Sequence, residues 1–113
     1  MDKYVSYNDQ SDIFCVHKGF LSDEKFKGNM MVGDLVLDMS TKMRVRGIEI
    51  LNASQFLNIN DKLLNNLADA NFDANIGKSS ITISLILKTK DNIQIPTKIA
   101  VPIEERIPKF KRN

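Results

Sequence analysis

The chain has 113 residues, a formal net charge of +2 and a single cysteine. This length fits one domain with its own hydrophobic core, and a hydrophobic content of 42% argues against disorder of the whole chain. So small a net charge does not by itself indicate a nucleic acid or an anionic membrane as a partner. One cysteine excludes an internal disulfide bond.

The first half of the chain favours short β-strands, because apolar and β-branched residues are grouped between polar turn residues. We expect strands at residues 4–7, 12–17, 30–37 and 44–51. The polar segment 18–28 is expected to be a loop. Neither face of the strand at 44–51 is polar throughout, so this strand should lie inside a sheet, covered on both sides.

A short amphipathic helix is expected next, over about residues 60–70. Its apolar residues follow helical spacing: Leu63, Leu64, Leu67 and Ala68. Either Ser54 or Asn60 could cap a helix with a side-chain oxygen. A loop over residues 71–78 should follow this helix.

The last part of the chain predicts a C-terminal β-hairpin. Apolar and polar residues alternate over 81–87 and again over 93–101, with a plausible turn at residues 90–92. Pro96 and Pro102 cannot donate the hydrogen bonds of a sheet, so the last strand belongs at a sheet edge or is bent there.

Together these elements predict an α+β fold, a mostly antiparallel sheet or small two-sheet arrangement with one helix packed on a face. Residues 1–113 are read as a single domain, with a β-rich half (1–57), a helix-plus-hairpin half (58–108) and a basic tail (109–113). The first residues lack the apolar segment of a signal peptide, and no apolar run approaches the ~20 residues that span a bilayer. We therefore expect a soluble, cytoplasmic protein without a membrane partner.

Two runs of residues carry a family resemblance. Residues 7–16 read Tyr-Asn-Asp-Gln-Ser-Asp-Ile-Phe-Cys-Val, and residues 47–54 read Gly-Ile-Glu-Ile-Leu-Asn-Ala-Ser. With these runs, residues 4–57 resemble a family of small prokaryotic proteins described only as a domain of unknown function, whose pattern closes on Val-Gly-Ile-Glu-Ile-Leu-x-Ala-Ser. The resemblance implies a β-rich architecture and no established activity. The family is similar to components found beside toxin-like small proteins, which implies partner binding.

One departure from the family pattern predicts a different turn. Met43 stands where the family usually has glycine. Because a left-handed backbone conformation favours glycine, we expect a turn without a left-handed residue at this position.

Cys15 and His17 are two residues apart on an expected strand and so share a face. They could form a thiolate–imidazole pair or contribute to a metal site. A zinc site would need two more ligands, from carboxylates or from a symmetric dimer. We favour a buried cysteine and a strand-end histidine, and we predict no metal, no cofactor and no catalytic residues. The sequence also lacks a glycine-rich phosphate loop and the common hydrolase motifs, so we predict that the protein is not an enzyme.

Acidic and basic residues near the strand at 44–51 have structural and functional interpretations. Asp38 is expected to stabilise a turn, and Glu49 to form a cross-strand salt bridge with Arg44 or a neighbour. Arg44 and Arg46 could instead contact phosphates, together with the tail residues Lys109, Lys111 and Arg112. The phenylalanines are not interleaved with these charges as a base-stacking surface requires, which favours a solvated basic face.

The sequence thus ranks three functions. The first is a small protein-interaction module, acting as a homodimer or with a separate partner chain, because the apolar hairpin offers surface that a chain this short would leave exposed. The second is a nucleic-acid-binding accessory protein that uses Arg44, Arg46 and the basic tail. A metal-dependent or thiol enzyme built on Cys15 and His17 is the third.

Overall fold

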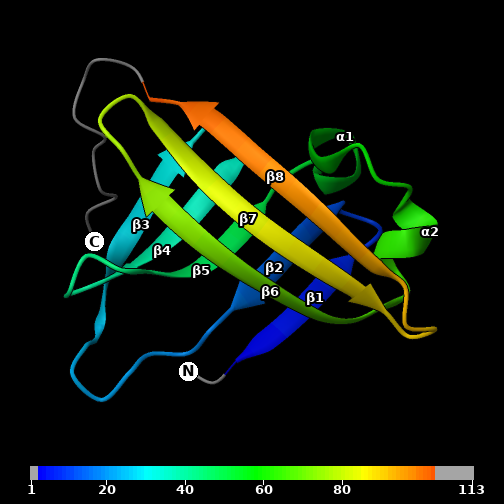
Figure 1. The fold of residues 1–113 in the computed structure, drawn as a ribbon, viewed down its shortest axis with the longest axis horizontal. Coiled ribbons are helices and arrows are strands. Elements are labelled where there is room, and N and C mark those ends of the chain that lie inside the picture. The colour runs from blue at the N-terminus through cyan, green and yellow to red at the C-terminus, as the bar shows by residue number, and fades with distance from the viewer. Residues whose placement is uncertain (1–2, 104–113) are drawn as a thin grey trace.

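The computed structural model describes residues 3–103, which form two antiparallel β-sheets packed face to face and two short helices (Figure 1). The five-stranded sheet has the order β1-β2-β5-β4-β3; its strands are β1 (Tyr4–Asn8), β2 (Ile13–His17), β3 (Phe26–Val32), β4 (Leu35–Ser40) and β5 (Val45–Ile50). The three-stranded sheet consists of β6 (Leu67–Ile76), β7 (Ser80–Thr89) and β8 (Gln94–Pro102), in that order. The helices α1 (Ala53–Leu57) and α2 (Asp61–Leu64) connect the two sheets.

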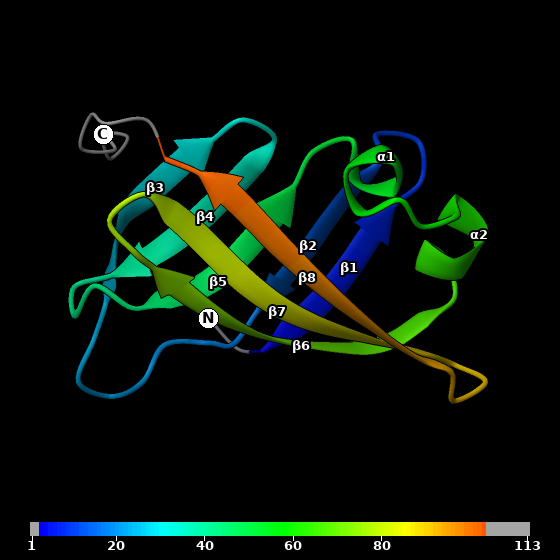
Figure 2. The same ribbon diagram turned by 45° about the horizontal axis from the view of Figure 1, so that its top comes forward.

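This architecture confirms the mostly antiparallel α+β prediction in its coarse form. The strand expected inside a sheet is β5, which lies between β2 and β4. The proline-bearing last strand, β8, is an edge strand. Figure 2 shows the three-stranded sheet crossing the five-stranded sheet obliquely. No helix within residues 3–103 is long and apolar enough to cross a membrane.

The helix expected over residues 60–70 is much shorter than predicted. Asn60 does cap α2, since its Oδ1 accepts a hydrogen bond of 2.8 Å from the Lys62 N–H. The helix ends at Leu64, however, and the chain enters β6 at Leu67, so most of the expected loop at 71–78 is strand as well. Pairing with β7 supplies the backbone hydrogen bonds that a longer helix would have made.

The single strand expected over residues 30–37 is in fact the end of β3, a two-residue turn and the start of β4. Gly33 begins that turn with φ of +59°, a conformation that glycine adopts without strain. The segment 18–28, expected to be a loop throughout, becomes strand at Phe26.

The core lies between the two sheets, and both halves of the chain contribute to it. The β7 side chains alternate regularly, with every second one buried against the other sheet: Ile81, Ile83, Leu85 and Leu87. The facing side chains come from the inner face of the five-stranded sheet, chiefly Phe14, Leu35, Leu37, Met39, Ile48 and Ile50. Burial of these side chains stabilises the sheet pair and leaves the outer face of the five-stranded sheet for other roles.

Candidate functional site

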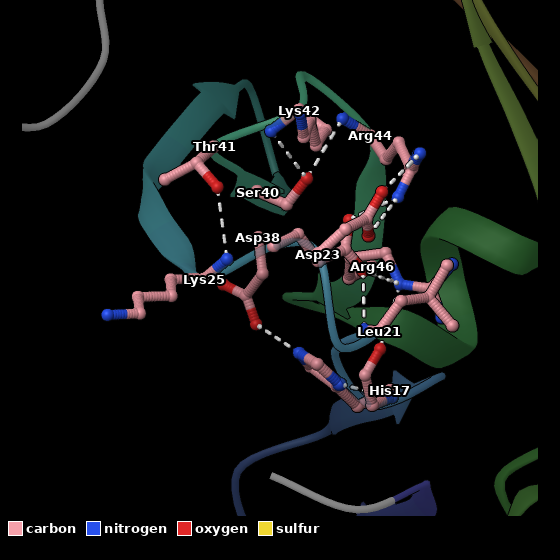
Figure 3. A network of polar contacts seen from close by, with 12 residues as sticks. His17, Leu21, Asp23, Lys25, Asp38, Ser40, Thr41, Lys42, Arg44 and Arg46 are labelled. Atoms are coloured by element: carbon pink, nitrogen blue, oxygen red, sulfur yellow. Dashed lines mark hydrogen bonds and ion pairs between the residues drawn. The ribbon is translucent and has the colours of Figure 1, made fainter.

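A row of polar residues crosses the outer face of the five-stranded sheet. The antiparallel registers place Tyr4, His17, Gly47, Asp38 and Asn29 opposite one another on β1, β2, β5, β4 and β3. Residues 18–25 form a loop that follows His17, which we call the lid loop. Figure 3 shows lid-loop residues together with the end of β4 and the start of β5, near His17 and Asp38 of this row.

Gly47 makes the centre of this row possible. A Cβ atom at position 47 would lie 2.4 Å from His17 Cδ2 and 2.7 Å from Asp38 Oδ2. Neither separation is sterically possible without movement of those groups. The glycine of the Gly-Ile-Glu-Ile-Leu run is therefore the residue that lets the imidazole and the carboxylate approach each other.

The His17 ring is almost completely buried, with 1% of its surface exposed. The Tyr4 ring stacks on one side of it at 6.0 Å between ring centroids, and the Phe20 ring of the lid loop contacts it edge-on at 5.0 Å. Burial lowers the pKa of His17 below its ordinary value, although Asp38 acts in the opposite direction. The ring is therefore neutral at neutral pH.

Hydrogen bonding fixes the orientation of the neutral ring. The Gly19 N–H donates to His17 Nδ1 at 2.8 Å, so the ring proton lies on Nε2. His17 Nε2 lies 3.7 Å from Asp38 Oδ2, and within residues 3–103 it is the one buried side-chain nitrogen or oxygen without a hydrogen-bond partner. Burial raises the pKa of Asp38, whose Oδ1 accepts a 2.5 Å hydrogen bond from Asn29.

Neither ring nitrogen of His17 has a free lone pair in this arrangement. Nδ1 accepts the Gly19 N–H and Nε2 carries the ring proton, so a metal ion would have to displace one of these hydrogens. In the described part of the chain there is also no group of three or more histidine, cysteine and acidic side chains that could hold a metal ion. Cys15 shares the outer face with His17, as expected, but its register partner is Glu49, and burial raises the pKa of its thiol.

Ion pairs hold the lid loop in addition to the ring contacts of Phe20. The side chain of Glu24 is fully buried and contacts Arg44 at 3.2 Å and Arg46 at 3.1 Å. It also accepts a 2.8 Å hydrogen bond from the Leu21 N–H within the loop. Arg46 Nε donates to the Gly19 carbonyl at 2.8 Å, so the same arginine secures the residue that orients His17.

Arg44 and Arg46 are thus engaged by acidic residues of the lid loop. Arg44 pairs with Asp23 at 2.9 Å in addition to Glu24. These contacts replace the salt bridge that we expected between Arg44 and Glu49. A cleft of about 390 Å³ lies beside both arginines, but its third cation, Lys18, is itself 3.5 Å from Asp73. The charges that could bind phosphate are therefore largely compensated, and Lys109, Lys111 and Arg112 lie outside the described residues.

The two runs that carry the family resemblance meet at Asp12. Asp12 Oδ1 accepts hydrogen bonds from the Tyr7 hydroxyl at 2.6 Å and from the Ser54 N–H at 3.0 Å, while Oδ2 accepts from the Ser54 hydroxyl at 2.7 Å. Hydrogen bonds from Tyr7 and Ser54 lower the pKa of Asp12. The cluster joins the β1–β2 turn to the start of α1 and so has a clear structural role.

Among the strands that the structure describes, none pairs with the second side of β3. The Leu51 N–H donates to the Asp34 carbonyl, so Asp34 and every second residue after it direct their backbone groups toward β5. The residues between them in β4, Leu35 and Leu37, therefore direct their backbone groups toward β3. Their register partners are Val32 and Met30. The intervening residues of β3, Asn29 and Met31, therefore direct their N–H and C=O groups away from the sheet.

We call this second side, from Phe26 to Val32, the β3 edge. It contains no proline, and two of its large apolar side chains are exposed, Phe26 by 45% and Met31 by 54%. An irregularity of register between Phe26 and Gly28 leaves a regular segment from Gly28 to Val32. A regular, unpaired edge of this kind can accept a further strand.

The β8 edge of the other sheet differs in its backbone. Hydrogen bonds between Thr89 and Ile93 and between Ile103 and Ser79 turn the odd-numbered residues of β8 toward β7. The even-numbered residues face outward, and Pro96 and Pro102 among them have no N–H to donate. A cleft of about 430 Å³ between this edge and α1 is lined in part by Phe56 and Leu57.

The structure thus brings together residues that the sequence did not connect. Asp38 lies beside His17 rather than in a turn, because β5 lies between β2 and β4. Glu24, Asn29 and Met31 were not singled out from the sequence. The apolar run Met30-Met31-Val32 was the available signal for β3, but no local pattern indicates which strand will be an edge.

Comparison of the chain with models of known protein families, with curated proteins and with solved structures found no match in any of the three. The family resemblance of residues 4–57 therefore stays a prediction.

Proposed function

We propose that this protein is a small protein-interaction module that binds an extended polypeptide segment along the β3 edge. The observation that carries the proposal is the open, proline-free backbone at Asn29 and Met31. An added strand could form main-chain hydrogen bonds with both residues, as in other cases of strand addition. The role requires neither a cofactor nor catalytic residues.

The other sheet edges, at β8, β1 and β6, are less suited to binding an extended segment than β3. The β8 edge lacks two N–H donors because of Pro96 and Pro102. The strands β1 and β6 lie against each other, and Lys3 Nζ near β1 donates a 2.9 Å hydrogen bond to Asn71 Oδ1 on β6. A bound segment would therefore find its most continuous set of partners at β3.

Exposed side chains add an apolar component to the same edge. Met31 lies on the outer face beside Val36, and Phe26 contacts the lid-loop residue Phe20 at 6.3 Å between ring centroids. Methionine adapts its shape readily to a partner surface. Affinity would thus come from the backbone of β3, and selectivity from side chains that contact Met31 and Phe26.

The experiment is a pull-down with the tagged full-length chain, with and without nuclease, using the wild type and two matched proline variants. Met31→Pro removes an outward-facing donor from the β3 edge, whereas Ala100→Pro removes an equivalent donor from the β8 edge. Because neither N–H bonds within its own sheet, both variants should fold, which circular dichroism would check. We expect a stoichiometric protein partner, including a second copy of the chain, to be lost only with Met31→Pro.

Two results would contradict the proposal. One is a partner that binds equally well to all three proteins. The other is nucleic acid that co-purifies in a salt-dependent manner and whose digestion removes every other component, which would favour the nucleic-acid alternative at Arg44 and Arg46.

A further inference from the structure

We propose that the segment bound at the β3 edge is β3 of a second copy of this chain, paired antiparallel about a two-fold axis at Met30. The inference rests on the proposed function, because it takes the β3 edge as the interaction surface. It adds the identity of the partner and the register of the pairing.

The register follows from the part of β3 that is regular. Only the segment from Gly28 to Val32 keeps an uninterrupted register with β4, and Met30 is its midpoint. With the axis at Met30, Asn29 of one copy faces Met31 of the other, and the reverse pair forms by symmetry. The outward N–H and C=O groups of these two residues then form four hydrogen bonds across the axis.

Charge does not oppose this pairing. The segment from Gly28 to Val32 contains no ionisable side chain. The nearest charge, Lys27, would lie about 20 Å along the strands from its counterpart in the second copy, at ~3.3 Å per residue. That separation exceeds the Debye length of about 8 Å at physiological ionic strength, so repulsion between the two lysines is screened.

The pairing also covers an exposed apolar side chain. In this register the two Met31 side chains lie on the same outer face, on residues that are diagonal neighbours across the axis. Each is 54% exposed in the single chain. Diagonal cross-strand neighbours are within reach of long side chains, so the two methionines can contact each other. The five-stranded sheets of the two copies would become one continuous sheet.

The register can be tested by disulfide formation between differently tagged copies. Asn29→Cys and Met31→Cys are each made in a Cys15→Ser background, which removes the native thiol. Facing residues would have Cα atoms about 5.5 Å apart, within the range that a disulfide bridges. Identical residues would lie diagonally, at about 7–8 Å or more, which is unfavourable for a disulfide.

We expect the mixture of the two variants to form a cross-linked heterodimer under mild oxidation, and either variant alone to form several-fold less. A mixture of Met31→Cys with Ile86→Cys, an exposed β7 residue, measures random collision. Light scattering of the wild type at micromolar concentration should give twice 12.8 kDa. Met31→Pro should return the mass to that of a single chain.

The inference is overturned if the Asn29→Cys and Met31→Cys mixture cross-links no faster than the collision control, or if Asn29→Cys cross-links best with itself. A wild-type mass near 12.8 kDa would overturn it as well. In each of these cases, the proposed function still stands if the pull-down recovers a different partner protein that fails to bind only the Met31→Pro variant. Partner binding that is unchanged in the Met31→Pro variant would overturn both the proposed function and this inference.

Discussion

The two sheets of this protein are built in different ways. In the three-stranded sheet, β7 alternates buried and exposed residues along its whole length, and its stability comes from apolar burial. The five-stranded sheet has shorter strands, two irregular registers and a lid loop held by the buried carboxylate of Glu24. Polar contacts therefore position the outer face of one sheet, whereas burial fixes the other. Substitutions should affect the two sheets differently.

The largest effect on stability should come from a substitution at Gly47, because the side chains of His17 and Asp38 lie close to its Cα atom. Gly47→Ala places a methyl group within 2.4 Å of His17 Cδ2, and we expect it to lower the free energy of unfolding by about 1–3 kcal/mol through overpacking. The matched change Gly77→Ala, in the hairpin of the other sheet, meets the Ser80 carbonyl and should cost less stability than Gly47→Ala, because its closest contact is 3.3 Å rather than 2.4 Å. Urea denaturation of both variants measures the difference. Equal stability would show that the His17–Asp38 row tolerates a side chain at its centre.

The pH dependence of the free energy of unfolding should reflect the buried His17 in the same row of residues. Because burial lowers its folded-state pKa, the unfolded chain binds this proton more readily. Its contribution to stability is present above the unfolded value of about 6.5 and is lost as the pH falls through the lowered pKa. His17→Gln has no titrating group there and should lose less stability than the wild type on acidification from neutral pH. Denaturation midpoints at a series of pH values would show this, and parallel curves would contradict it.

The smallest effect concerns Met43, which corrects one sequence-based expectation. It adopts φ of +60°, so the β4–β5 turn does contain a left-handed residue although it lacks the glycine usual in the resembling family. That conformation costs a bulky residue about 1–2 kcal/mol, and glycine in turn loses about 0.5–1 kcal/mol of chain entropy. Met43→Gly should therefore stabilise the protein by about 0.5–1 kcal/mol.

A matched control for Met43→Gly lies in the turn between β7 and β8. Asn92 also has a positive φ, of +68°, but asparagine tolerates this conformation well. Asn92→Gly should therefore give little or no stabilisation. Thermal denaturation of the two variants compares the turns directly, and a larger gain at Asn92 than at Met43 would contradict the strain assigned to Met43.

The missed strand β6 shows how a local pattern can be outweighed. Leu63, Leu64 and Leu67 fit helical spacing, yet Leu67 begins a strand that pairs with β7. A second pattern was present in the sequence, because residues 68–76 alternate strictly between apolar and polar. Ala70 and Phe72 are buried on that account, while the intervening residues are not. The helical pattern ends at Ala68, where the alternating pattern begins, and only the pairing with β7 decides where the strand starts.

The sequence by itself determined the pairing of β7 with β8, though not the strand β6 that completes their sheet, together with the inner position of β5 and the edge position of β8. These follow from alternation, from two apolar faces and from prolines, which act through nearby residues. Only the tertiary structure decided that Asp38 would approach His17, that Glu24 would hold both arginines, and that β3 would be the open edge. Those outcomes depend on the strand order β1-β2-β5-β4-β3, which joins segments distant in the chain and has no local signature.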